Sequence, residues 1–131
     1  MKGYIADIEE LTLGNTDFRR VLYTGKHLQL VLMALAPGEE IGAEVHKTHD
    51  QFFRVEAGSG AVEIDGVRTP IKDDDVVIVP AGARHNVINT GEGPLKLYTL
   101  YGPPEHRDGL VHVEKPEEEL DEEHFDGKTT E

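Results

Sequence analysis

The chain has 131 residues, a length that suits one domain of ordinary size, and it contains no cysteine. The lack of cysteine excludes a disulfide framework, thiolate zinc sites and cysteine nucleophiles, and it fits the reducing cytoplasm in which we expect the protein. The chain has no run of about 18 apolar residues, so the sequence predicts no transmembrane helix. The opening MKGYIADIEE carries acids early and is not typical of a signal peptide.

The formal net charge is −13 and is unevenly distributed. Residues 114–131 hold nine acids and two bases, a net charge of −7, which leaves −6 for the first 113 residues. An acidic chain repels phosphate backbones and anionic membrane surfaces, so we expect neither nucleic acid nor membrane as a partner. We divide the chain into a mildly acidic domain, residues 1–113, and an acidic C-terminal tail, residues 114–131.

Short apolar segments separated by turn residues fill the first 113 residues. Residues 27–36 are apolar on both faces, like a strand between two layers, and residues 51–57 alternate between apolar and polar side chains. GSG at 58–60 and DG at 65–66 predict hairpin turns. Further strands are expected at 41–46 and in AVEID, VRTPI, DVVIVP, HNVIN and PLKLYTLY. With turns every 8–12 residues and no helical stripe before Pro116, the pattern predicts an all-β sandwich or barrel.

The tail has room for one short helix, which would start after Pro116 and end near Gly127. Two interpretations stay open for it. The tail is either a solvated acidic appendage, or a lid or dimer contact that uses His124 and Phe125.

The segment EVHKTHDQFF, residues 44–53, crowds many candidate metal ligands into a short space. Strand alternation places Glu44 and His46 on one face. Gln51 opens the next strand, and a KTHD turn joining two neighbouring strands would bring all three side chains together. His49 lies in that turn, so we expect it to be exposed, with contact to a substrate at the rim as the alternative. The remaining histidines show no paired spacing and are interpreted as surface or loop residues: His27, His106, His112 and His124.

A second segment, PAGARHNVIN at residues 80–89, adds one more candidate ligand. Pro80 and Gly82 predict a tight corner, after which His85 and Asn89 share one face of a strand. His85 is the candidate ligand, and Asn89 is interpreted as a polar anchor at the strand end.

Together the two segments resemble the paired motifs of the cupin family. The first motif has glycine, five residues, His-x-His, three or four residues, glutamate, six residues and glycine; the second has glycine, five residues, Pro-x-Gly, two residues, histidine, three residues and asparagine. The matching positions at these spacings are Gly38, Glu44-Val45-His46, Gln51 and Gly58, then Asp74, Pro80-Ala81-Gly82, His85 and Asn89. The resemblance implies a jelly-roll double-stranded β-helix, as in small RmlC-like or mannose-6-phosphate isomerase-like cupins. It also implies a homodimer that pairs through an edge such as the N-terminal strand or PLKLYTLY.

By this resemblance the family's metal ligands fall on Glu44, His46, Gln51 and His85. Glutamate thus replaces the first histidine, and glutamine replaces the usual glutamate. Two imidazoles, a carboxylate and an amide oxygen suit a divalent transition metal such as Mn, Fe, Ni or Zn. A single anionic ligand leaves a divalent site near +1, which favours an anionic, bidentate oxygen ligand. The alternative is an empty site in which Glu44 pairs with an interior arginine.

Two functions stay open for such a site, both with a small-molecule partner. The first is an enzyme that acts on a sugar-like or keto-acid oxygen ligand through isomerase, lyase or dioxygenase chemistry. The glutamine ligand resembles that of uronate-linearising cupins, and Glu44 and His49 are the candidate general bases. The second is a non-catalytic binding or sensor cupin with a retained or vestigial metal site.

Overall fold

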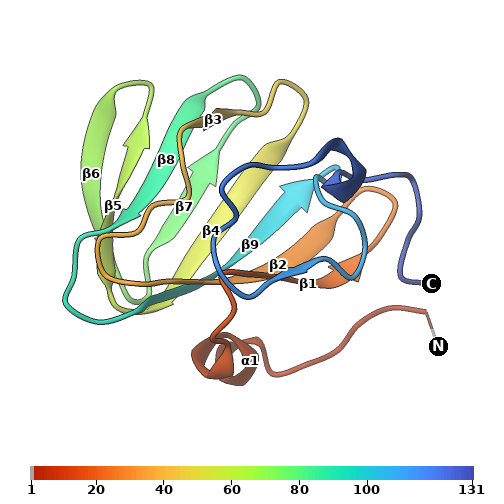
Figure 1. The fold of residues 1–131 in the computed structure, drawn as a ribbon, viewed down its shortest axis with the longest axis horizontal. Coiled ribbons are helices and arrows are strands. Elements are labelled where there is room, and N and C mark those ends of the chain that lie inside the picture. The colour runs from red at the N-terminus through yellow and green to blue at the C-terminus, as the bar shows by residue number, and fades with distance from the viewer. Residues whose placement is uncertain (1) are drawn as a thin grey trace.

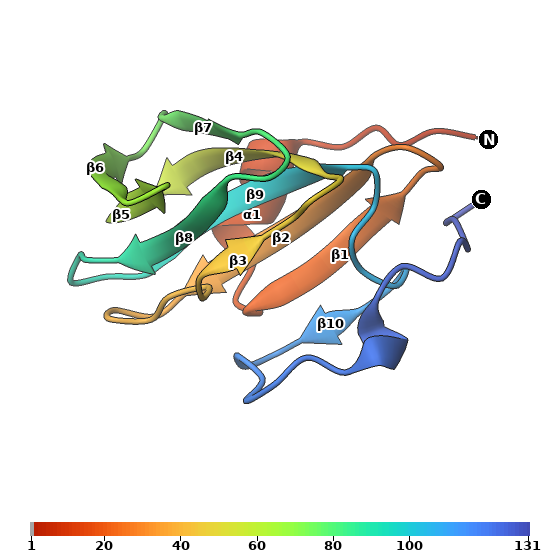
Figure 2. The ribbon, with the colours of Figure 1, turned by 90° about the horizontal axis from the view of Figure 1, so that it is seen from above.

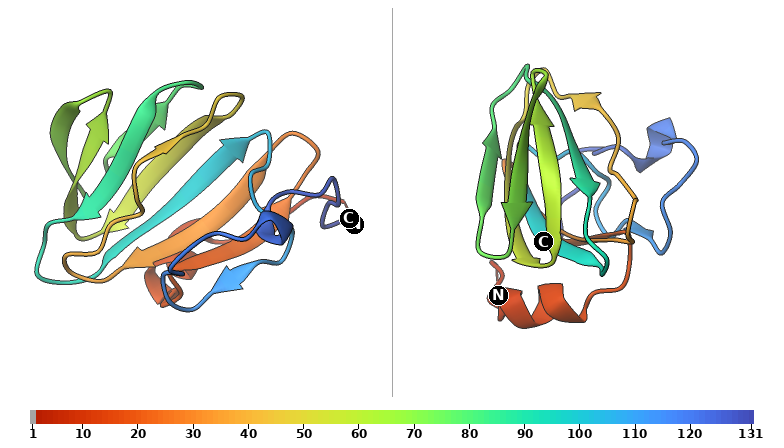
Figure 3. Two further views of the ribbon diagram at one scale, coloured as in Figure 1. Left: turned by 45° about the horizontal axis from the view of Figure 1, so that its top comes forward. Right: turned by 90° about the vertical axis from the view of Figure 1, so that its left-hand side faces the viewer.

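Two antiparallel sheets face each other in the computed structural model, which describes residues 2–131 (Figures 1 and 3). The larger sheet has the strand order β10-β1-β2-β9-β4-β7, and the smaller has the order β3-β8-β5-β6. The larger sheet contains β1 (Arg19–Thr24), β2 (Gln29–Leu35), β4 (Asp50–Ala57), β7 (Val76–Val79), β9 (Leu95–Gly102) and β10 (Val111–His112). The smaller sheet contains β3 (Glu44–Val45), β5 (Ser59–Ile64), β6 (Val67–Lys72) and β8 (Arg84–Asn89). The predicted all-β double-stranded β-helix is confirmed.

The core fills the space between the two sheets. Alternate residues of each strand point into it, as the period-two pattern of β4 predicts: Phe53 and Val55 are buried, while Phe52 and Arg54 are half-buried on the outer face. Leu97 of β9 lies opposite Val55 and joins the same cluster. Each large apolar side chain that is fully buried contributes roughly 1.5–3 kcal/mol. The core therefore holds the two sheets at a fixed separation and fixes the position of any side chain that points between them.

Left-handed backbone marks two tight turns, and the sequence predicts the one at residues 65–66. Asp65 and Gly66 have φ values of 47° and 83°, as a two-residue type I′ hairpin requires. Asp74, which stands where the second cupin motif has glycine, has a φ of 73°. The backbone there keeps the glycine-like conformation although the side chain has changed.

A helix near the N-terminus is one element that sequence reasoning missed. Residues Ile8–Gly14 form α1, and Asp7 caps it because its carboxylate accepts a hydrogen bond from the Glu10 amide at 3.1 Å. The helix contacts β2, β4 and β9 from below (Figure 1). With only two turns and only Thr12 fully buried, α1 is too short to show a helical stripe. No helix within residues 2–131 is long and apolar enough to span a membrane.

The predicted dimerisation edges are not edges. β9, which contains PLKLYTLY, pairs with β2 on one side and β4 on the other, and β1 lies between β10 and β2. The outer strands of the two sheets are β10, β7, β3 and β6. An apolar alternating strand gives no local sign of how many neighbours it will acquire, so the edge assignment was wrong. The homodimer itself stays a prediction.

The C-terminal tail, residues 114–131, returns to the barrel and includes a short 3₁₀ helix, Asp121–Glu123 (Figure 2). Three backbone hydrogen bonds join the tail to the rest of the chain. The amide of Arg107 donates to the carbonyl of Glu123 at 2.8 Å, that of Phe125 to Glu105 at 3.0 Å, and that of Thr130 to Thr24 at 2.9 Å. The structure thus favours a tail in contact with the barrel over a free appendage.

Candidate functional site

β3 and β8 place two of the expected ligands face to face. Glu44 pairs directly with His85 across the smaller sheet, and side chains in such a pair leave from the same face. Gln51 comes from β4, which belongs to the larger sheet. The expectation that β3 and β4 are neighbouring strands was therefore wrong, because the connection after His46 crosses from one sheet to the other. The donors still meet, but across the barrel interior.

His85 and Gln51 form the buried end of the site. The ring Nδ1 of His85 lies 3.1 Å from the Ala83 carbonyl, which can only accept a hydrogen bond, so Nδ1 carries the proton. Its Nε2 then presents a lone pair to the Gln51 Oε1 at 3.1 Å, while the Gln51 amide nitrogen donates to Thr99 at 3.0 Å. Burial lowers the pKa of His85 and keeps this ring neutral. Two acceptors therefore face each other.

Glu44 and His46 form the outer end of the site. The His46 Nε2 lies 2.8 Å from the Glu44 Oε2, but the two are not aligned as a hydrogen bond, and this buried nitrogen has no hydrogen-bond partner among residues 2–131. Burial alone would raise the pKa of Glu44, but His46, Arg19 and His85 together lower it below its usual value. Burial opposes protonation of His46, yet the carboxylates of Glu44 and Glu105 raise its pKa overall. Glu44 is therefore a carboxylate at neutral pH.

The donor set fits a divalent metal ion. One ligand atom each from Glu44, His46 and His85 lies within 4.8 Å of the others. Metal bonds of about 2.1 Å in octahedral geometry put adjacent donors about 3 Å apart and opposite donors about 4.2 Å apart. The separations of 2.8 and 3.1 Å match adjacent positions. An ion would also satisfy the unpartnered His46 nitrogen and the two facing lone pairs.

Glu105 lies at the centre of a histidine cluster beside this site. Its Oε2 is 3.6 Å from the Nδ1 of His46 and 3.3 Å from the Nε2 of His49, and its Oε1 is 3.3 Å from the Nδ1 of His124. A carboxylate behind the second nitrogen of a histidine typically orients it toward a metal. Sequence reasoning missed Glu105, because it follows two prolines and has no spacing relation to the motifs.

The position of His49 in the turn predicts exposure to solvent. The residue instead lies at the rim of the barrel, which was the alternative. Its side chain is 17% exposed, and its Nε2 lies 3.0 Å from the Pro104 carbonyl as well as beside Glu105. The segment that follows β9 folds over the turn and covers the ring. His49 lines a separate surface hollow with His124 and Phe125, and not the cavity beside Glu44.

His106 lies in the loop between β9 and β10, in keeping with the expectation of a surface or loop residue, but it is buried. It is 4% exposed, and its Nε2 lies 3.3 Å from the Tyr101 hydroxyl. The buried Gln29 holds its backbone inside, since the Gln29 amide donates to the His106 carbonyl at 2.7 Å and accepts from its amide at 3.0 Å. Loss of hydration lowers the pKa of His106 well below its usual value.

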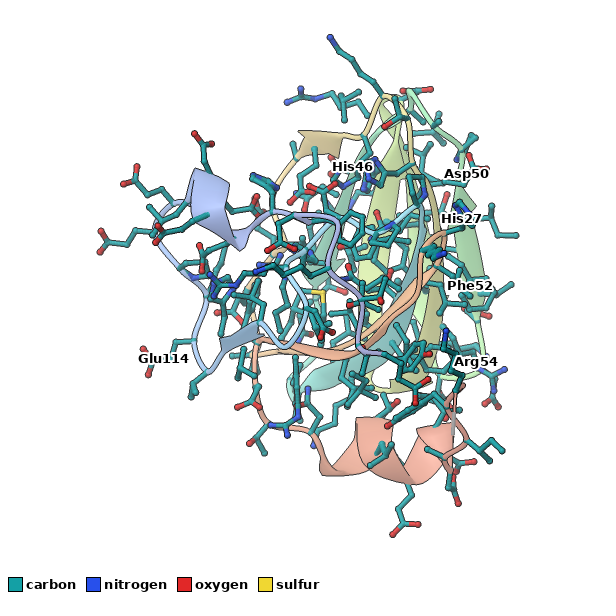
Figure 4. All side chains as sticks on the ribbon, turned by 90° about the vertical axis from the view of Figure 1, so that its right-hand side faces the viewer. His27, His46, Asp50, Phe52, Arg54 and Glu114 are labelled. Atoms are coloured by element: carbon teal, nitrogen blue, oxygen red, sulfur yellow. The ribbon has the colours of Figure 1, made fainter. Side chains whose placement is uncertain are left out.

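A cavity of about 490 Å³ opens beside the outer end of the site. Its walls come from β1, the loop before β3, and the tail, and they include Arg19, Glu44, His46, Glu105 and Glu119. Figure 4 shows His46 within the crowded space next to β3, while Phe52 and Arg54 lie on the outer side of the molecule. Sequence reasoning missed Arg19, although its period-two relation to the apolar Val21 is a signal that it points inward.

Comparison with known proteins gives a family match over most of the barrel. A family model described as a cupin domain matches residues 31–101. The uncharacterized protein YrkC of Bacillus subtilis (strain 168) is 46% identical over 120 residues, a region that covers 87% of this chain. This chain spans 64% of the length of YrkC, less than two thirds of it.

Two solved structures are similar to this chain in fold. The crystal structure of BH2720 from Bacillus halodurans is 45% identical, covers 87% of this chain and 91% of its own, and superposes with a TM-score of 0.86. A Thermotoga maritima protein described as a predicted oxalate decarboxylase is 27% identical, covers 60% of this chain and 68% of its own, and has a TM-score of 0.57.

Proposed function

We propose that this chain, which belongs to the cupin family, binds one divalent transition metal and uses it to hold a small ligand through the ligand's oxygen atoms. The ligands would be Glu44, His46, Gln51 and His85. The observation that carries the proposal is the buried His46 Nε2, which makes no aligned hydrogen bond within residues 2–131 and lies 2.8 Å from the Glu44 Oε2. Mn, Fe, Ni or Zn would fit these donors and, when bound, would polarise the oxygen atoms of the ligand.

The residues around the site suit chemistry on a small hydroxy or keto acid. Glu44 lines the cavity as a carboxylate, and it can accept a proton from a bound ligand when it is not coordinated to the metal. His49 lines a different hollow, so a proton-transfer role is better supported for Glu44 than for His49. The similarity to a protein described as a predicted oxalate decarboxylase supports a carboxylic acid as the ligand. The proposed reaction is of the isomerase, lyase or dioxygenase type.

Metal titration tests the binding site directly. Protein stripped with a chelator is titrated with Mn²⁺ and Zn²⁺ by calorimetry, together with the variants His85→Ala and His27→Ala. We expect one ion per chain and a loss of more than about 100-fold in affinity for His85→Ala, because loss of a residue that only orients a metal ligand already costs 10–100-fold. His27 is exposed and serves as the control. Equal affinity in the wild type and His85→Ala would reject the site.

A turnover assay separates an enzyme from a binding module. The metal-loaded protein is incubated with pyruvate, glyoxylate or D-galacturonate, and the reaction is followed by proton NMR. An enzyme gives new resonances that disappear in His46→Ala. A non-catalytic cupin binds one of these acids and returns it unchanged.

A further inference from the structure

A buried arginine with unused hydrogen-bonding capacity lines the cavity beside the proposed metal site. Arg19 is 2% exposed, and its guanidinium lies over the Phe18 ring at 5.2 Å. One terminal nitrogen contacts the His112 Nδ1 at 3.1 Å, but the buried Nε has no hydrogen-bond partner among residues 2–131. A guanidinium has five N–H donors, so this one retains the capacity for a planar, bidentate partner.

One hydrogen bond and one long ion pair hold the guanidinium in place. Because a guanidinium only donates, the His112 Nδ1 accepts, and the His112 Nε2 then donates to Glu123 at 2.6 Å. The single carboxylate within ion-pair distance of Arg19 in the described chain is Glu119 of the tail, at 3.7 Å. Glu119 is 38% exposed and also lines the cavity. A charge that is 2% exposed is costly to bury without a close partner, so the site favours an anion.

We infer that Arg19 binds the carboxylate of the ligand that the metal site takes, and that Glu119 occupies this position when no ligand is bound. The inference rests on the proposed function and narrows its ligand to a small carboxylic acid with a second oxygen function. Arg19 and Glu44 line the same cavity, whose volume of about 490 Å³ suits a keto acid or a sugar acid. A planar guanidinium matches a carboxylate in geometry as well as in charge.

The role of Glu119 distinguishes an Arg19 that binds the ligand from an Arg19 that only supports the fold. If the Glu119 carboxylate competes with the ligand, its removal raises the affinity for carboxylates and leaves the affinity for uncharged ligands unchanged. Glu118 lines the same cavity and carries the same charge, but it makes no ion pair with Arg19. Glu118→Gln is therefore the matched control for a general change in charge.

The experiment measures binding of D-galacturonate, pyruvate and the uncharged D-galactose by calorimetry, in metal-free and Mn²⁺-loaded protein. We expect at least one of the two acids to bind more tightly than D-galactose. Glu119→Gln should bind that acid at least about threefold more tightly than the wild type, with no such gain in Glu118→Gln. Arg19→Gln should lose more than about tenfold, since charge-assisted bidentate pairs are among the strongest hydrogen bonds in proteins. Circular dichroism checks that each variant folds.

Glu119 is partly exposed, so Glu119→Gln should fold. This variant therefore tests the role of Arg19 even if Arg19→Gln does not fold. Equal affinities in Glu119→Gln and Glu118→Gln, or full carboxylate affinity in a folded Arg19→Gln, would overturn the inference, as would binding of neither acid. Metal binding is measured separately. Carboxylate binding that depends on Arg19 in a protein that takes no metal would refute only the proposed function, while metal binding with no effect of either variant would refute only the role of Arg19.

Discussion

His85 Nε2 and Gln51 Oε1 lie 3.1 Å apart in the barrel interior, each offering a lone pair to the other. A cation between them would satisfy both. If the amide turned over, its nitrogen could donate to His85 and its oxygen could accept from the Thr99 hydroxyl, so the same pair can be satisfied without an ion. Gln51 itself therefore adds no buried charge when the site holds no ion.

Gln51→Glu should restore the carboxylate found at this position in the cupin motif. We expect metal affinity to rise by about tenfold, because a second anionic ligand strengthens binding to a dication. In the absence of metal the same change buries a carboxylate at a position that is 3% exposed, so the variant should lose at least about 1 kcal/mol of unfolding free energy. Metal titration and urea unfolding with and without chelator measure the two effects. Gln51→Met, which removes the donor, is the control, and unchanged affinity in both variants would contradict a ligand role.

Glu105→Gln should weaken metal binding although Glu105 is not a proposed ligand. Its carboxylate lies 3.6 Å from the Nδ1 of His46 and favours the orientation in which Nε2 points to the site. Loss of such a partner typically costs 10–100-fold in metal affinity, so we expect a loss of about tenfold or more in calorimetric titrations. Glu63→Gln, at a half-exposed position on β5 where the carboxylate pairs with Arg68 and with no residue of the cluster, is the control. If both variants bind metal equally well, the orienting role is excluded.

His106 should make the protein less stable in acid. The folded-state pKa of His106 lies well below the value of 6.5 expected in the unfolded chain, chiefly because burial removes its hydration. As the pH falls through 6.5, the unfolded chain binds a proton that the folded chain does not, and the unfolding free energy decreases.

Urea unfolding at pH 8.0 and pH 5.5 measures this effect in the wild type, His106→Gln and the exposed control His27→Gln. We expect the decrease on acidification to be smaller in His106→Gln than in the other two. The same decrease in all three proteins would show that His106 does not carry the acid sensitivity.

Gly58→Ala should destabilise the barrel. Gly58 closes the first motif with a φ of +95°, and a Cβ there would lie 2.5 Å from the Pro94 carbonyl oxygen. The left-handed backbone and the clash together should cost about 2–4 kcal/mol of unfolding free energy. Gly93→Ala is the control, because a Cβ at Gly93 meets nothing within 4 Å. Equal unfolding midpoints for the two variants would show that the backbone at Gly58 and Pro94 shifts to accept a Cβ without a loss of stability.

Most of the fold was readable from local patterns. The alternation around Phe53 and the DG turn at 65–66 predict strands and a hairpin, because side-chain direction and positive φ depend on neighbouring residues alone. The resemblance to the cupin motifs also implied that Glu44, His46 and His85 would come together, and their ligand atoms do lie within 4.8 Å of one another. α1 was missed because seven residues are too few for a helical period to emerge.

The sequence by itself determined the strands, the tight turns and the residue types of the donor set, since each depends on local conformation or on motif spacing. Only the tertiary structure decided that β9 is a central strand, that His106 is buried, and that Glu105 lies behind His46. It also brought Arg19 of β1 to Glu119 of the tail, a pair separated by a hundred residues. These relations depend on how the two sheets and the tail pack together, and contacts between distant segments leave no periodic trace in the chain.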